Sequence, residues 1–74
     1  MSRLLHEAGE ALWGPRWQVE MSRELAVSDR TVRRWAAGVT PVPGGVWVDL
    51  LRLSQERAAA LDALAGRLAE AGAS

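Results

Sequence analysis

The sequence predicts an all-α, four-helix protein in which a core of three short helices precedes one long C-terminal helix. Three observations lead to this prediction. Apolar residues recur at intervals of three and four over most of the 74 residues, which is the spacing of one helix face. Glycine, alone or with proline, stands where two of the short helices should end. A serine followed by an aspartate stands where another helix should begin.

The first predicted helix spans about residues 2–13 and has one apolar face. That face holds Leu4, Leu5, Ala8, Ala11 and Leu12. Gly14 and Pro15 follow directly. They should end the helix, because glycine suits a left-handed cap and proline cannot continue the hydrogen bonding.

Two short helices follow, over about residues 16–25 and 28–37. The residues expected to face the core are Trp17, Met21, Leu25, Val32, Trp35 and Ala36. Ser28 should cap the second of these helices, with Asp29 in its positively polarised first turn. Gly38 should end it.

An extended loop is predicted over 39–45, because Pro41 and Pro43 disfavour helix. From about 46 to 71 the pattern is helical again, and such a helix would be about 39 Å long. Its apolar side holds Trp47, Leu50, Leu51, Ser54, Ala58, Leu61, Leu64, Ala65 and Leu68. The first half can cover the core, whereas the second half extends beyond it.

Composition excludes several classes of protein. The chain has no cysteine, so disulfide frameworks and thiolate chemistry are excluded. No apolar run approaches the roughly 20 residues that a bilayer span requires. Charges interrupt the N-terminal segment MSRLLHEAGE, which therefore does not resemble a signal peptide. A cytoplasmic location is the resulting expectation.

The formal charge is zero, but it is unevenly distributed. Between residues 16 and 38 five arginines face three acids, a local charge of +2, and the remainder has four arginines against six acids, a local −2. All nine basic residues are arginine, which suits bidentate recognition of guanine and phosphate. The same usage is equally typical of a GC-rich genome.

The helix predicted over 28–37 has two different sides when its residues are placed about 100° apart. Arg30 and Arg34 fall together with Ala37 on the side opposite Val32 and Trp35. Arg33 flanks this outer side. Like charges four residues apart destabilise an isolated helix slightly. The major groove of DNA admits one α-helix and offers acceptors to such cations, so the pattern favours a DNA-binding module.

The segment 18–38 resembles the helix-turn-helix of lambda-repressor and Cro-like (XRE-type) regulators. The residues that carry the resemblance are Gln18, Ser22, Val27, Ser28, Thr31, Val32 and Trp35. Two positions depart from the family pattern. Ser22 replaces the usual alanine, and Ala26 stands where the turn usually carries glycine, so it must tolerate a conformation that alanine disfavours.

The resemblance implies a set of DNA-binding residues. The base-contacting positions fall on Asp29, Arg30, Arg33 and Arg34. Phosphate or bracing contacts fall on Gln18, Ser28, Thr31 and Thr40. Arg16 is added on separate grounds, because the start of a helix offers free N–H groups and positive polarity to a phosphate. For Asp29 a second role stays open, in which its carboxylate only helps to cap the helix or orients Arg33.

Two other functions fit the sequence less well. An enzyme has the least support, because the only histidine, His6, lacks a second histidine four residues later. No cofactor, metal or small-molecule ligand is expected. The stronger rival is an adaptor or small-terminase-like module that uses the same scaffold to bind protein. A protein-binding helix should present apolar anchors, whereas this one presents arginines.

The prediction divides the chain into a DNA-binding domain over 1–55 and a helical extension over 56–74. The last helix is expected to form a dimer contact through four leucines whose spacing resembles a short heptad pattern. They are Leu50, Leu61, Leu64 and Leu68. A single helix folded back on its own domain and a partly disordered tail are the alternatives. The function expected is a homodimeric repressor that inserts the helix 29–37 into an inverted-repeat operator. Its size is similar to that of regulators from phages and mobile elements.

Overall fold

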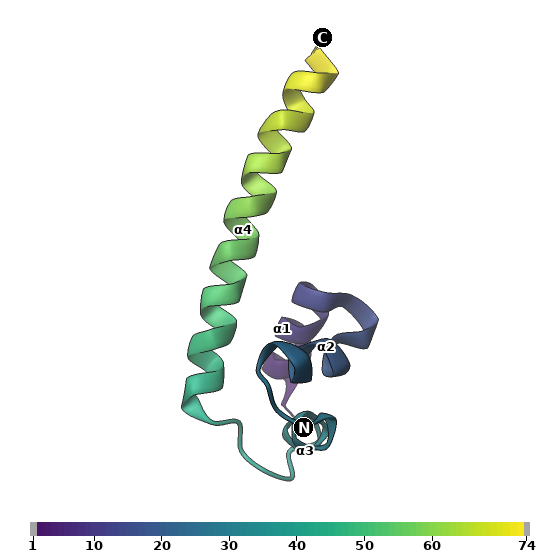
Figure 1. Cartoon of the computed structure of the whole chain (residues 1–74), viewed down its shortest axis with the longest axis vertical. Helices are drawn as coiled ribbons and strands as arrows, with labels where there is room; N and C mark the ends of the chain where they lie inside the picture. The colour runs from purple at the N-terminus through teal and green to yellow at the C-terminus, as the bar shows by residue number, and fades with distance from the viewer. Residues whose placement is uncertain (1, 74) are drawn as a thin grey trace.

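The computed structural model describes residues 2–73 and is helical throughout except for short connections (Figure 1). In chain order the elements are α1 Arg3–Trp13, the 3₁₀ turn η1 Gly14–Arg16, α2 Trp17–Glu24, α3 Asp29–Ala37 and α4 Gly44–Ala73. No strand occurs within this described part, so the all-α prediction is confirmed. Residues 1 and 74, at the outer ends of the two predicted domains, lie outside it.

Helix α1 begins one residue later than predicted, because Ser2 is its cap rather than its first residue. The Ser2 side chain accepts a hydrogen bond from the Leu5 N–H at 3.4 Å. Gly14 ends the helix as expected, and its N–H donates to the Glu10 carbonyl. It is not in the left-handed cap conformation that was expected, because its φ of +81° is combined with a ψ of −155°. The chain then makes the tight turn η1 before α2, so Arg16 belongs to η1 and not to the second helix.

Helices α2 and α3 both end in a Schellman motif, in which a left-handed residue lets two N–H groups bond back to the helix. Gly38 has this role at the end of α3, with φ +77°. Ala26 has it after α2, with φ +55°. The Ala26 and Val27 N–H groups donate to the carbonyls of Arg23 and Ser22 at 3.3 and 2.9 Å. The expected strain at Ala26 is thus confirmed.

Helix α4 begins at Gly44, two residues before the predicted start, and continues to Ala73. Gly44 and Gly45 therefore lie in its first turn and not in the loop. The N–H groups of a first turn need no partner within the helix. The main free-energy cost of forming this first turn is thus the low helix propensity of the two glycines. The Val46 N–H donates to the Pro43 carbonyl at 3.0 Å and closes this turn.

The core lies where α1, α2 and α3 meet the first turns of α4. Its fully or nearly buried apolar residues are Leu5, Leu12, Trp17, Met21, Val32, Trp35, Ala36 and Leu50. Trp47, expected in the core, is only half-buried and packs at its edge. Leu50 is 3% exposed, so the α4 side chain that closes the core is a leucine.

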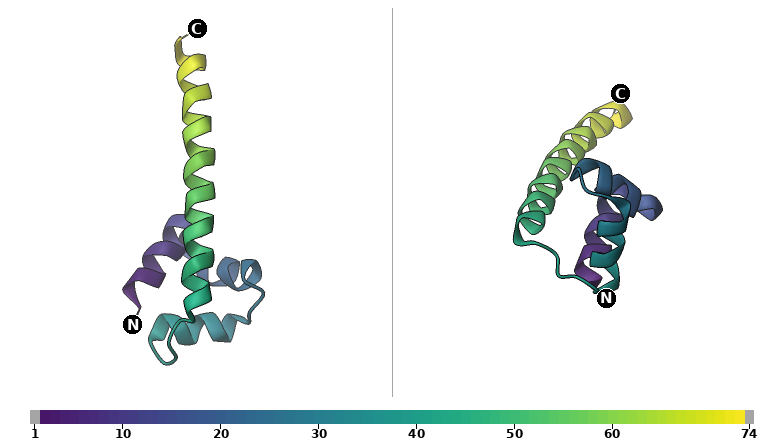
Figure 2. Two further views of the ribbon diagram at one scale, coloured as in Figure 1. Left: turned by 90° about the vertical axis from the view of Figure 1, so that its left-hand side faces the viewer. Right: turned by 60° about the horizontal axis from the view of Figure 1, so that its bottom comes forward.

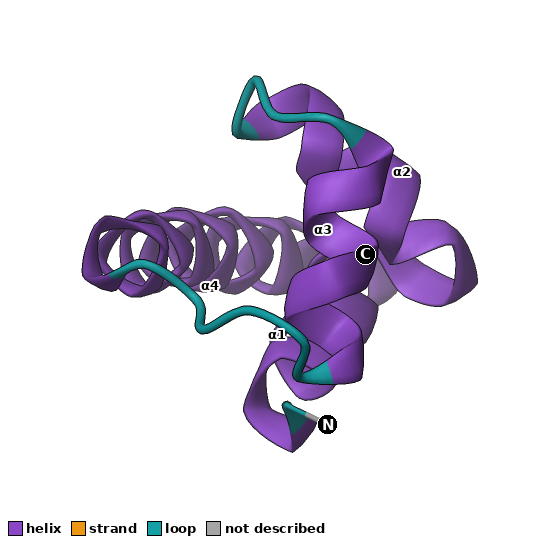
Figure 3. Ribbon diagram, turned by 90° about the horizontal axis from the view of Figure 1, so that it is seen from below, coloured by secondary structure: helices purple, strands orange, loops and turns teal. Residues whose placement is uncertain are grey.

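We call residues 3–37 the head. Helix α4 packs along one side of the head, against α1, and then extends far beyond it (Figures 1 and 2). The molecule measures 52 × 22 × 21 Å as a result. Residues 54–73 are all exposed. Helix α3 lies across the base of the head, at the end of the molecule opposite the C-terminus (Figure 3).

Candidate nucleic-acid interface

The outer side of α3 presents cations to solvent. Arg30, Arg33 and Arg34 are exposed, as is Ala37. None of the three guanidinium groups has an ion pair or hydrogen bond to another described residue. The opposite side of the same helix is anchored in the core by residues no more than 5% exposed. These anchors are Val32, Trp35 and Ala36.

The start of α3 is fixed by Ser28, as predicted. Its Oγ accepts the Thr31 N–H at 3.1 Å and lies 2.9 Å from the Thr31 hydroxyl. The backbone of Ser28 is extended, as a helix cap requires. Both hydroxyl groups therefore have partners inside the protein. For Ser28 and Thr31 the geometry supports a role in positioning α3 more directly than a contact with phosphate.

Asp29 has a defined partner in α2. Its carboxylate accepts a hydrogen bond from the Ser22 hydroxyl, with Oγ and Oδ1 2.5 Å apart. The same hydroxyl lies 2.6 Å from the Val19 carbonyl and has only one proton to share between them. Because Ser22 is 4% exposed, this link ties α2 to the first turn of α3. The arrangement gives Asp29 a structural role, but a different one from the capping of the helix or the orientation of Arg33 that the sequence left open.

The start of α2 adjoins the outer side of α3. Gln18 and Arg33 line one shallow hollow together with Ala37 of α3 and His6 of α1. A second hollow beside it is lined by Arg16 and Gln18. Gln18 is common to both, so Arg16, Gln18 and Arg33 border one continuous surface. An elongated polyanion lying along α3 could meet all three.

Thr40 lies in the loop that follows α3 and is half-buried. Its N–H points back to the Arg34 carbonyl at 3.4 Å. It lines a hollow between this loop and the start of α4, with Trp35 and Trp47. Thr40 thus lines neither of the two hollows that Arg16, Gln18 and Arg33 border.

The four leucines predicted to form the dimer contact do not share one environment. Leu61, Leu64 and Leu68 are 44–62% exposed on the protruding part of α4. Leu50 differs, because it is buried in the core of its own chain and has no surface to offer a partner. Helical spacing groups the four leucines together. It cannot show that Leu50, unlike the other three, is buried against the head.

Sequence reasoning missed two residues near this surface. His6 was considered only as a metal ligand that lacks a second histidine, yet its ring meets the Trp17 ring edge-on, with centroids 5.0 Å apart. Gly9 was given no role, but a Cβ there would overlap the Trp17 indole. The available signal was the spacing of His6 and Gly9, three residues apart on one side of α1. It gave no indication of which aromatic residue would cover them.

Comparisons with protein-family models, with curated proteins and with solved structures give no match for this chain. Among the described residues, no helix combines the length and the apolar character needed to cross a membrane. That same part of the chain holds no group of three or more histidine, aspartate or glutamate side chains arranged to bind a metal ion.

Proposed function

We propose that the protein is a cytoplasmic transcriptional regulator that binds double-stranded DNA through α3. One observation carries the proposal: three exposed arginines, with no ion pair or hydrogen bond to another described residue, stand on a helix whose other side is anchored by Val32 and Trp35. Unpaired guanidinium groups on a rigid helix suit a partner that supplies negative charge and acceptors.

DNA offers both. The major groove is about 12 Å wide and admits an α-helix, and guanine presents two acceptors that match one guanidinium group. Arg30 and Arg34 lie at the centre of the outer side of α3 and are the residues proposed to contact bases. Arg16, Gln18 and Arg33 border the same surface and are proposed to contact phosphates, which fix the position of a protein on the duplex. In this proposal the head is a lambda-repressor-like helix-turn-helix domain.

We further propose that the protein acts as a homodimeric repressor. The protruding half of α4 supports this, since it exposes leucines that contribute nothing to the core of one chain. A small core gives only a few kcal/mol of net stability, so association would stabilise the fold as well. Two copies of α3 held about 34 Å apart would match an inverted repeat with half-sites one helical turn apart.

Selection of bound sites from random duplex DNA tests the function directly. The expected result is an enriched palindromic motif with a conserved G·C pair in each half-site. Filter binding of the enriched duplex at increasing salt should then show a steep fall in affinity, because phosphate contacts release counterions. If no duplex is enriched over the starting pool, the DNA-binding proposal is wrong and a protein partner becomes the candidate.

A further inference from the structure

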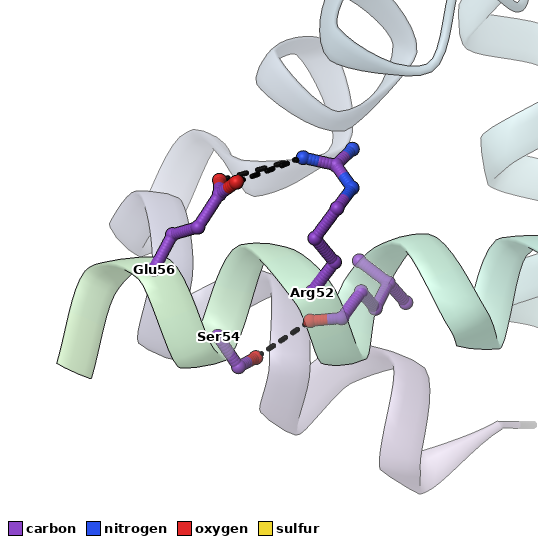
Figure 4. Close-up of polar contacts among 4 residues, drawn as sticks. Arg52, Ser54 and Glu56 are labelled. Atoms are coloured by element: carbon purple, nitrogen blue, oxygen red, sulfur yellow. Dashed lines mark hydrogen bonds and ion pairs between the residues drawn. The ribbon is translucent and has the colours of Figure 1, made fainter. Parts of the chain in front are cut away.

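Helix α4 has a second apolar face besides the one that closes the core. We call it the seam: it follows steps of three and four and consists of Leu51, Ser54, Ala58, Leu61, Ala65 and Leu68. All six residues are exposed and none is charged. The single hydroxyl on it is already used, since Ser54 donates to the Leu50 carbonyl at 2.7 Å (Figure 4). The seam therefore offers a partner an apolar surface without an unsatisfied polar group.

The seam is turned about 80° around α4 from the side that Leu50 and Leu53 direct to the head, at about 100° per residue. Leu64 lies on the head side of the helix rather than on the seam. This difference matters for any partner helix. A helix packed on the side of Leu50 and Leu64 would meet the face of the head that α4 covers, whereas a helix packed on the seam would meet only the edge of α1.

The lower end of the seam continues onto α1. Leu51 and Ser54 form one wall of an apolar groove of about 330 Å³, and Leu4 and Ala8 of α1 form the other. Leu4 and Leu51 are 61% and 58% exposed at its rims. Exposed leucines on two different helices thus border the same groove, and one helix seated on the seam would cover both.

We propose that the occupant is the α4 helix of a second copy of this chain, packed parallel and in register along the seam. The inference rests on the dimer of the proposed function and assigns its contact face and orientation. In this register every residue of the seam meets its own copy, so that leucine meets leucine, alanine meets alanine and serine meets serine. The contact is then isologous, as a two-fold dimer requires.

The charges beside the seam favour the parallel orientation. Arg57 and Asp62 flank the seam on opposite sides, at the g and e positions of a heptad. In a parallel pair a g residue meets the e residue five positions later in the partner, so each Arg57 faces an Asp62. An antiparallel pair brings g residues to g residues and e residues to e residues, which opposes like charges.

These two groups are free to make that contact. Neither Arg57 nor Asp62 has an ion pair within the described residues. They cannot pair with each other in one helix, because five residues separate them by about 140°. By contrast, Arg52 and Glu56 on another side of α4 are joined within the chain at 3.3 Å (Figure 4).

The parallel orientation also suits the position of α3. Because α3 lies at the end of the molecule opposite the C-terminus (Figure 1), two parallel α4 helices would bring both copies of α3 to the same end. One duplex could then contact both. An antiparallel pair would place them at opposite ends of the dimer.

Cysteine cross-linking tests the seam, and the natural absence of cysteine makes each variant a single-cysteine protein. In full-length Ala65→Cys, the two cysteines should lie opposite each other and form a disulfide-linked dimer on mild oxidation. Ala63→Cys, on the opposite side of α4, is the matched control and should remain uncross-linked. Faster cross-linking of Leu64→Cys than of Ala65→Cys, or no cross-linking of either, would overturn the seam.

Charge reversal tests the orientation. Arg57→Glu and Asp62→Arg should each raise the dissociation constant of the dimer about tenfold, because two symmetric pairs become repulsive. The double variant should restore it to within a fewfold of the parent, as measured by sedimentation equilibrium. A double variant that is weaker than both single variants would overturn the parallel pairing.

DNA binding measured on the same variants separates this inference from the proposed function. Cross-linked Ala65→Cys that binds no duplex would leave the seam in place and overturn the function. If neither Ala65→Cys nor Leu64→Cys cross-links but the protein still binds an inverted-repeat duplex, the seam is overturned and the proposed function stands.

Discussion

At Gly9 the backbone of α1 lies directly against the indole of Trp17. Glycine inside a helix normally destabilises it by about 1 kcal/mol relative to alanine. Here the missing side chain makes room for a ring that is 5% exposed and that also meets His6 edge-on. One small residue therefore sets how closely α1 and α2 approach.

We expect Gly9→Ala to lower the free energy of unfolding by about 1 to 3 kcal/mol, the usual range for overpacking a core. The added Cβ would overlap the Trp17 ring, and this outweighs the gain in helix propensity. Gly66→Ala is the control, because nothing lies within 4 Å of a Cβ there. Urea unfolding followed by circular dichroism gives the comparison. Equal stability of Gly9→Ala and the parent would contradict the packing of Trp17 on Gly9.

Ala26 is the other residue at which local conformation and sequence disagree. Its φ of +55° is the only positive value of a non-glycine residue in the described range. A left-handed conformation costs an L-residue about 1–2 kcal/mol. Gly38 makes the equivalent turn after α3 without that strain.

Ala26→Gly should therefore stabilise the protein by about 0.5–1 kcal/mol, after subtraction of the greater unfolded-state entropy of glycine. Thermal unfolding should show a melting temperature a few degrees above that of the parent. Ala37→Gly, a residue inside α3, should lower it because a right-handed helical position gains nothing from glycine. A lower melting temperature for Ala26→Gly would show that the turn is not strained.

At the scale of the element, α3 combines a capped start, a left-handed end and two unlike sides. Ser28 and Gly38 could be predicted because capping depends on neighbours within one turn. Val32 and Trp35 could be predicted because a 3.6-residue period distributes side chains around the axis. The link between Ser22 and Asp29 could not, since it joins two helices whose crossing the sequence does not specify.

Arg30→Ala and Arg34→Ala should each weaken binding to a selected operator by about 1–3 kcal/mol, the range for loss of a base contact. The fold should remain intact because both side chains are exposed. Arg23→Ala is the control, since its guanidinium lies on α2, 3.6 Å from Glu20. Fluorescence anisotropy with labelled duplex measures all three. Unchanged affinity in both α3 variants would show that another surface binds the operator.

Arg33→Ala should behave differently from these two variants. A phosphate contact carries no sequence information, so its loss should weaken binding to all duplexes by a similar factor. The slope of log affinity against log salt should fall by about 1. The same titration on a scrambled duplex checks this, and selective loss of the operator alone would instead assign Arg33 to base contact.

At the scale of the whole molecule, α4 has two halves with different surroundings. All of its buried and half-buried side chains lie at or before Leu53, whereas residues 54–73 are exposed. A helix with one broad apolar side was predicted over this whole stretch. Periodicity could not separate the part that meets the head from the part that does not.

Truncation after Gln55 should abolish dimerisation while the head remains folded, because no core residue lies beyond Leu50. Affinity for a two-half-site operator should then fall about 10²-fold, since the second half-site is no longer bound by a linked module. Sedimentation velocity and anisotropy measure the two effects. A truncated protein that still dimerises would place the interface on the head.

The order of helices, their caps and the outward arginines of α3 were settled by local rules. Each depends on residues within one or two turns, where backbone geometry leaves few alternatives. Only the tertiary structure showed three further contacts. They are the burial of Leu50, the packing of Trp17 on Gly9 and the shared surface of Gln18 and Arg33. These contacts join segments distant in the chain, so they depend on how helices cross, which no single helix period contains.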